Sequence, residues 1–217
     1  LLIKMHNQQP TISTKDGTVN PVICECNDGY LNDIRGLHVK TEDIYTAIAN
    51  ANTVFDEGAV GAGRGMSCFQ LKGGIGTSSR LIQLGDETYV LGSLVLSNFG
   101  RKDQLMINGQ AIGKSISSQA KQEEKGSIIM IIATDLPLSV NELRRIARRS
   151  SIGLSRVGGY MGNGSGEIAI AFSTANTYPL KTDTPFTTIK SLHQNHIDQV
   201  FQAVGESIEE SVLNSMI

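Results

Sequence analysis

The chain has 217 residues, with 19 Lys and Arg, 21 Asp and Glu, and a formal net charge of −2. A hydrophobic content of 40% is enough for a folded core and argues against disorder. Because the charges nearly balance and no apolar run reaches the roughly 20 residues of a membrane span, we expect neither a nucleic-acid-binding protein nor an integral membrane protein. The length predicts one domain, over residues 1–217, or a closely merged pair.

Three cysteines, Cys24, Cys26 and Cys68, are too few and too unevenly spaced for a disulfide framework. Reduced thiols on strands are the favoured interpretation, and they indicate a cytoplasmic location. Cys24 and Cys26 could be combined with His38 as metal ligands, but the spacing matches no zinc pattern. We therefore expect no metal and no other cofactor.

The first half of the chain predicts short elements. Residues 21–26 predict a strand, and a threonine followed by acidic residues predicts a helix over about 42–54. The segment 58–76 is rich in glycine and is predicted to be a loop with short strands at most. Residues 89–96 predict a strand that is buried on most sides.

The second half mixes strands and helices. An Asn-Gly dipeptide predicts a hairpin over residues 105–112, and residues 114–126 are polar enough to be a flexible connection. Strands are predicted at 128–133 and 168–172, and helices at 139–149 and 193–213. Because strict βαβ alternation is missing, we expect either two helix-covered sheets or one mixed sheet.

Two glycine-rich motifs approach nucleotide-binding patterns but do not match them. After Gly61 and Gly63, the third glycine of G-x-G-x-x-G would fall at Met66. Residues 108–115 end in Gly-Lys-Ser, but Asn108 stands where a phosphate loop needs its first glycine. The sequence also lacks a G-x-S-x-G nucleophile elbow, so no histidine is placed beside such a motif.

The sequence Asn163-Gly164-Ser165-Gly166 leads directly into the predicted strand at 168–172. It can be a plain turn. It can also be a self-cleavage site, where the Ser165 hydroxyl attacks the Gly164 carbonyl and the resulting ester hydrolyses. The new terminal amine, with an ordinary pKa of about 7.7–8.0, would then accept the proton of its own hydroxyl. The residues alone leave both interpretations open.

Seven separated stretches form an informative combination. They are residues 27–34, 60–68, 72–80, 98–100, 133–138, 163–166 and 171–175. Together they resemble the family of L-aminopeptidase/D-alanine-esterase-amidases and beta-peptidyl aminopeptidases, over most of residues 20–217. Since family chains extend further at both ends, the resemblance implies that this chain is partial.

The resemblance implies an α+β fold, a four-layer αββα sandwich like that of the N-terminal-nucleophile hydrolases but with different connectivity. It implies self-cleavage between Gly164 and Ser165, which gives residues 1–164 and 165–217 as subunits that stay together. The processed enzyme would remove N-terminal residues from peptides, amides or esters through an acyl-enzyme, as a homo-oligomer of such units.

Site residues follow from the same resemblance. Ser165 would be the nucleophile, Asn98 would donate to the oxyanion, and Tyr30 would assist Asn98. Glu25 would hold the ammonium group of the substrate, because an aminopeptidase needs an anion for a free amine.

A further catalytic pair, Ser-x-Glu, matches Ser207 and Glu209 best. On a continuous helix, residues two apart point ~200° away from each other. Both side chains could face the nucleophile only if the helix broke, for which Gly205 is the candidate.

Two alternatives remain open. An ornithine-acetyltransferase-like acyl-transfer enzyme would also cleave itself, but it would use threonine where this chain has Ser165. A non-catalytic, glycine-rich assembly or binding protein would use Asn-Gly-Ser only as a turn. The sequence does not distinguish α- from β-amino substrates, or D from L.

Overall fold

The computed structural model describes residues 20–116, 125–179 and 182–217. Its main sheet has four strands in the order β3-β4-β5-β6. These strands are β3 (Ile75–Leu84), β4 (Glu87–Asn98), β5 (Gly126–Thr134) and β6 (Ser165–Ser173). The pairs β3–β4 and β4–β5 are antiparallel, whereas β5 and β6 are parallel. β6 therefore starts at the same end of the sheet as β5, next to the end of β4.

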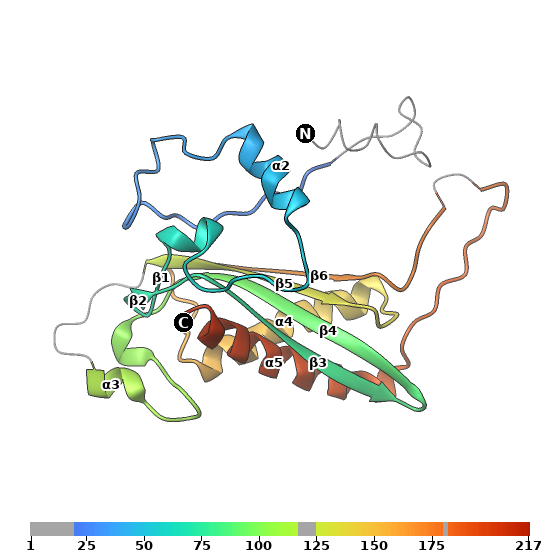
Figure 1. Cartoon of the computed structure of the whole chain (residues 1–217). Coiled ribbons are helices and arrows are strands. Elements are labelled where there is room, and N and C mark those ends of the chain that lie inside the picture. Colours follow the sequence, from blue (N-terminus) through green and yellow to red (C-terminus); the bar gives the residue numbers. More distant parts are fainter. Residues whose placement is uncertain (1–19, 117–124, 180–181) are drawn as a thin grey trace.

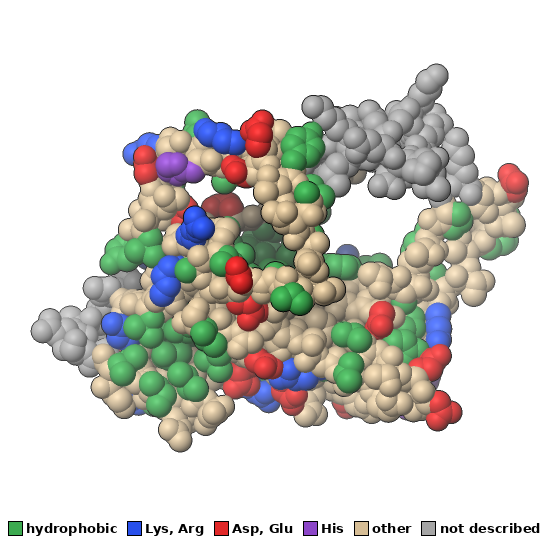
Figure 2. Space-filling view, viewed as in Figure 1, with side chains coloured by type: hydrophobic (Ala, Val, Ile, Leu, Met, Phe, Trp, Pro, Cys, Tyr) green, Lys and Arg blue, Asp and Glu red, His purple; other side chains and the backbone are tan. Residues whose placement is uncertain are grey.

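Two long helices, α4 (Val140–Arg156) and α5 (Ile197–Asn214), cover one face of this sheet (Figure 1). A segment with α2 (Thr41–Ala49) lies over the opposite face, and the molecule is hollowed between this segment and the sheet (Figure 2). The short elements are η1 (Gly61–Gly65), β1 (Ser67–Cys68), β2 (Leu71–Lys72), η2 (Lys102–Gln104), α3 (Ile112–Ile116) and η3 (Gln194–His196). Besides a small two-stranded sheet of β1 and β2, the described residues thus supply one sheet layer and one helix layer of the four layers expected.

Alternation along β4 decides which residues form the core. Leu91 and Val95 are fully buried towards the helices, where they join Val204 and Ile208 of α5 in one hydrophobic cluster. Burying each of these side chains contributes about 1.5–3 kcal/mol. The apolar face predicted for the last helix is confirmed, although Phe201 is only partly buried.

Small residues let α5 approach the sheet closely. A Cβ atom on Gly76 of β3 would lie 2.0 Å from the carbonyl oxygen of Ser211, so only glycine fits there. The Ser93 hydroxyl on β4 contacts the hydroxyl of Ser211 at 2.7 Å. This close contact fixes the position of the helix on the sheet.

Several predicted elements are confirmed. Ser139 and Glu142 form the expected capping box, with the Glu142 carboxylate accepting from the Ser139 backbone N–H at 2.7 Å. The Asn-Gly turn forms, with Asn108 at φ 50° and Gly109 at φ 73°, but the predicted hairpin is limited to one bridge between Ile107 and Gln110. Residues 112–116 form α3 instead of a hairpin strand and a flexible connection. Residues 117–124 of the predicted connection lie outside the described residues.

Other predictions need correction. Residues 21–26 form no strand, because only Cys26 among them is buried, against Met66 and Ile129. The helix expected to reach residue 54 ends at Ala49, and the ten-residue strand β3 was not predicted. None of the helices described is both long and apolar enough to cross a membrane.

Candidate active site

A cleft of about 920 Å³ lies where the end of β4 meets the starts of β5 and β6. We call it the β4–β5 cleft. Its lining includes Asn27, Tyr30, Ser67, Asn98, Gly126 and Gly164. Three parts of the chain thus contribute to one cavity: the described segment before η1, which we call the N-terminal segment, the β1–β2 hairpin, and the ends of the three strands. Of the residues predicted for the site, Asn98, Tyr30 and Gly164 line it.

The Gly164–Ser165 peptide bond is held on both sides. The Ser165 N–H donates to the carbonyl oxygen of Gly162 at 2.9 Å, which closes a turn. The Gly164 carbonyl oxygen accepts from the backbone N–H of Gly126 at 3.3 Å. This donor is aimed at the oxygen that would carry negative charge if the carbonyl were attacked.

The Ser165 hydroxyl does not line the cleft. Its Oγ atom is buried and has no hydrogen-bond partner among the described residues. Because side chains alternate along a strand, Ser165 shares a face of β6 with Ala169, which packs against the core under the helices. The hydroxyl therefore faces the helix layer while the chain is continuous.

Asn98 lies on the other face of the sheet. It pairs in register with Ser127, and Ser127 pairs with Gly166, whereas Ser165 pairs with Gly126. The Asn98 side chain accepts from the Ser67 N–H and donates to the Asn27 carbonyl oxygen, both at 2.9 Å. These contacts hold the amide at the cleft. The structure thus places Asn98 at the same cleft as Gly164, but on the opposite face of the sheet from the Ser165 hydroxyl.

Tyr30 and Glu25 lie in the N-terminal segment. The Tyr30 side chain borders the cleft and is 87% exposed. Glu25 is exposed and does not line the cleft, but it lies two residues before Asn27, which does. Burial raises the pKa of the neighbouring Cys26 thiol, and the charge of Glu25 raises it further.

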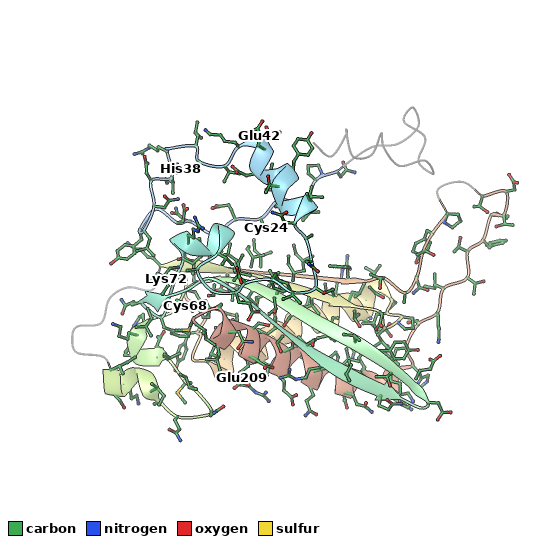
Figure 3. The ribbon with its side chains drawn as sticks, viewed as in Figure 1. Cys24, His38, Glu42, Cys68, Lys72 and Glu209 are labelled. Carbon is green, nitrogen blue, oxygen red and sulfur yellow. The ribbon has the colours of Figure 1, made fainter. Side chains whose placement is uncertain are left out.

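Ser207 and Glu209 lie elsewhere. The Ser207 hydroxyl is fully buried against the Ser93 hydroxyl, 2.5 Å away. Ser93 pairs with Ile132, six residues along β5 from Gly126, so Ser207 is roughly 20 Å from the Gly164–Ser165 bond. Glu209 forms an ion pair with Arg156 at 3.2 Å, on the helix side of the sheet (Figure 3).

The suggestion that Gly205 breaks the helix is wrong. α5 runs without interruption from Ile197 to Asn214. A Cβ atom at Gly205 would lie 3.3 Å from Ile152 of α4, so this glycine lets the two helices pack closely. The structure therefore does not bring the predicted Ser-x-Glu pair to the cleft.

Two features of the candidate site were missed in the sequence. Gly126 donates to the Gly164 carbonyl only because β5 and β6 pair in one register, which no local motif reveals. Lys72 binds the carbonyl oxygens of Gly63, Met66 and Gly73 at 2.6, 3.0 and 2.7 Å, and burial lowers its pKa. Lys72 thereby fixes the glycine-rich loop that leads to Ser67 at the cleft.

The residues considered as metal ligands in the sequence do not form a metal site among the described residues. Cys24 and His38 both lie in the N-terminal segment (Figure 3). Across residues 20–116, 125–179 and 182–217, no three His, Cys, Asp or Glu side chains gather as ligands for a metal ion.

The chain is similar to several known proteins. A beta-peptidyl aminopeptidase from Sphingosinicella microcystinivorans is 35% identical over 91% of the chain and 54% of its own length. The solved PH0078 protein of Pyrococcus horikoshii superposes with a TM-score of 0.89 at 47% identity, over 99% of this chain and 60% of its own. The L-aminopeptidase D-Ala-esterase/amidase of Ochrobactrum anthropi superposes with a TM-score of 0.81 at 41% identity, over 87% and 52%.

The Ochrobactrum enzyme is described as a new variant among the Ntn hydrolase fold, so the expected fold class is confirmed. This chain spans about half the length of the curated relatives that it matches. The sequence profile of Peptidase family S58 matches residues 1–217. Because this match covers the whole chain, and because the chain superposes on a serine aminopeptidase, the chain belongs to peptidase family S58.

Proposed function

We propose that this chain is part of a self-processing serine aminopeptidase that releases N-terminal residues from peptides, amides or esters. The observation that carries the proposal is the position of the Gly164–Ser165 bond. Gly164 lines the β4–β5 cleft, its carbonyl oxygen accepts from Gly126, and Asn98 borders the same cavity. Family membership favours this function over an acyl-transfer enzyme and over a non-catalytic binding protein.

In the proposed first stage, the chain cuts itself before Ser165 and gives residues 1–164 and 165–217. The Ser165 Oγ attacks the Gly164 carbonyl carbon, and the Gly126 N–H stabilises the charge that develops on the carbonyl oxygen. The ester that forms is then hydrolysed by water. Both fragments remain folded together, because β6 pairs with β5 along its whole length.

In the second stage, the new chain end changes what Ser165 can reach. Once the bond to Gly164 is cut, the backbone at Ser165 is no longer fixed from its N-terminal side, and its hydroxyl can turn from the helix layer to the cleft. There the free amine of Ser165 takes the hydroxyl proton during attack on the substrate. The Asn98 amide stabilises the oxyanion, which is typically worth about 3–4 kcal/mol.

Substrate recognition completes the proposal. Glu25, in the segment that leads to Asn27, holds the ammonium group of the substrate, and Tyr30 contributes to the wall of the cleft. Water finally resolves the acyl-enzyme on Ser165. No step assigned to these residues uses a metal or a cofactor.

The proposal is tested by comparing the full-length wild type with Ser165→Ala. We expect the wild type to show two fragments by intact mass and to hydrolyse amino-acid p-nitroanilides. Ser165→Ala should remain one chain and be inactive. Cleavage of the Ala variant at the same bond would contradict the assignment of the nucleophile, and an uncut, inactive wild type would contradict the function.

Location and assembly are part of the same proposal. Three free cysteines favour a reducing compartment such as the cytoplasm. A homo-oligomer of processed units follows from the family resemblance. Cell fractionation and light scattering of the full-length protein measure the two properties.

A further inference from the structure

The proposed first cut lacks a base. After cleavage, the Ser165 amine can accept a proton, but before cleavage the same nitrogen belongs to an amide. It donates its N–H to Gly162 at 2.9 Å and has no lone pair available for a proton. Another group must therefore take the hydroxyl proton of Ser165 during self-cleavage. This inference rests on the proposed function, because it concerns the origin of the cut that the function requires.

Histidine does not supply this base in the described structure. His38 is exposed in the N-terminal segment, on the opposite side of the sheet from the helices (Figure 3). His193 and His196 precede α5, and His196 is exposed. Glu167 is the one titratable residue in the sequence of β6, and it follows the nucleophile by two positions.

A spacing of two in a strand places both side chains on one face. Ser165 and Glu167 alternate with Gly166 and Ile168, of which Ile168 is 49% exposed on the other face. The next residue on the shared face is Ala169, which packs against the core. Ser165 and Glu167 therefore lie side by side under the helix layer.

Both side chains carry an unsatisfied polar atom. Ser165 Oγ and Glu167 Oε1 are the two buried side-chain oxygens without a hydrogen-bond partner among the described residues. Leaving such an atom unpaired costs about 1–3 kcal/mol, and in a native structure it calls for a functional explanation. The two unpaired atoms are a hydroxyl and a carboxylate oxygen at alternate positions of one strand face, and they are not hydrogen-bonded to each other. Proton transfer between them therefore requires a side-chain rotation that closes this gap.

We propose that Glu167 is the general base of the self-cleavage step. Its carboxylate takes the proton from Ser165 Oγ as the oxygen bonds to the Gly164 carbonyl carbon. When the tetrahedral intermediate collapses, the C–N bond breaks and the protonated Glu167 returns the proton to the leaving α-amine. The products are the Gly164 ester and a neutral amine on Ser165, and Glu167 is again a carboxylate.

This assignment separates two chemical stages by the two faces of the sheet. Glu167 serves Ser165 on the helix side, where the hydroxyl lies in the continuous chain. Asn98 serves the cleft side, where the same hydroxyl would act after the cut. Self-cleavage and turnover should therefore respond differently to changes of Glu167.

The test uses cell-free synthesis of the full-length protein and follows conversion of the precursor by intact mass. Glu167→Gln keeps the size of the side chain but removes the base, so self-cleavage should slow by about 10²–10⁴-fold. Glu167→Asp keeps the carboxylate and should cleave at least tenfold faster than Glu167→Gln. Glu87→Gln, at the far end of β4, is the matched control and should cleave at the wild-type rate.

Two further measurements separate a chemical from a structural role. The thermal midpoint of Glu167→Gln should stay close to that of the wild type. Its loss in self-cleavage should exceed, at least tenfold, any loss in p-nitroanilide turnover per cleaved molecule. Wild-type cleavage of Glu167→Gln, equal slowing of the Gln and Asp variants, or loss of the fold together with cleavage would each overturn the inference. If the wild type cleaves and Ser165→Ala does not, such a result leaves the proposed function intact.

Discussion

Gly126 donates its backbone N–H to the carbonyl oxygen of Gly164 at 3.3 Å, so the first residue of β5 holds the bond proposed for cleavage. The same glycine packs against the end of β4. A Cβ atom at Gly126 would lie 2.2 Å from the carbonyl oxygen of Asn98. One small residue thus fixes the distance between the proposed cleavage site and the proposed oxyanion donor.

Gly126→Ala should therefore disturb both stability and self-cleavage. The added methyl group must push β4 away from β5, which costs about 1–3 kcal/mol. Urea unfolding and the rate of precursor conversion measure the two effects. Gly92→Ala is the control, because no atom lies within 4 Å of a Cβ there. Equal stability and equal conversion in both variants would show that the close approach is unimportant.

Asn98→Asp tests the oxyanion donor with little change in shape. The aspartate can still accept from the Ser67 N–H, but it cannot donate, and it adds a negative charge beside the oxyanion. We expect kcat of the processed enzyme to fall about 10²–10³-fold. Steady-state hydrolysis of an amino-acid p-nitroanilide measures the effect. A rise in KM at unchanged kcat would instead assign Asn98 to substrate binding.

Ser207→Ala distinguishes a packing role from a catalytic one. Its hydroxyl lies against Ser93, which keeps a second partner, Ser211, at 2.7 Å when Ser207 is truncated. We expect a loss of about 1 kcal/mol in the free energy of unfolding. Turnover per folded molecule should be close to that of the wild type, and a large fall in kcat without loss of stability would return Ser207 to the catalytic residues.

Glu210 makes the contact between α5 and β3 dependent on pH. A hydrogen bond from the Ser78 hydroxyl, together with the Arg80 guanidinium, holds the pKa of Glu210 below its ordinary value. A lowered pKa contributes stability above the pKa of the unfolded state, and this contribution is lost as the pH falls through the folded value.

Since the Glu210 side chain is 49% exposed, the effect should be small, under about 1 kcal/mol at neutral pH. The difference in unfolding free energy between wild type and Glu210→Gln should shrink towards zero in acid. Urea titrations of both proteins at neutral pH and at a series of acid pH values measure it. A difference that grows as the pH falls would contradict the assigned sign.

Much of the second half of the fold could be predicted from local signals. The capping box of Ser139 and Glu142 and the Asn108-Gly109 turn are satisfied within a few residues, so sequence and structure agree. β3 was missed because polar residues such as Thr77, Ser78 and Arg80 interrupt its apolar pattern. Pairing with β4 along all ten residues makes it a strand, and this is a long-range effect.

The sequence indicated which peptide bond lies at the candidate site, but not how the surrounding side chains are arranged. Asn-Gly-Ser before a strand, together with the family resemblance, made the Gly164–Ser165 bond a candidate for cleavage, whereas the face of the Ser165 hydroxyl depends on the register of β6 with β5. The prediction that Ser207 and Glu209 join the site came from the family resemblance, although their spacing on a continuous helix already argued against it. Where that helix lies on the sheet is decided by packing of Gly76 against Ser211, which is remote in sequence.

The most direct test of the account is N-terminal sequencing of the purified full-length protein after separation under denaturing conditions. The account predicts a second N-terminus that begins Ser165-Gly166-Glu167, in equal amount to the first. A single N-terminus in protein that hydrolyses amino-acid amides, or a second N-terminus at any other residue, would contradict self-cleavage before Ser165.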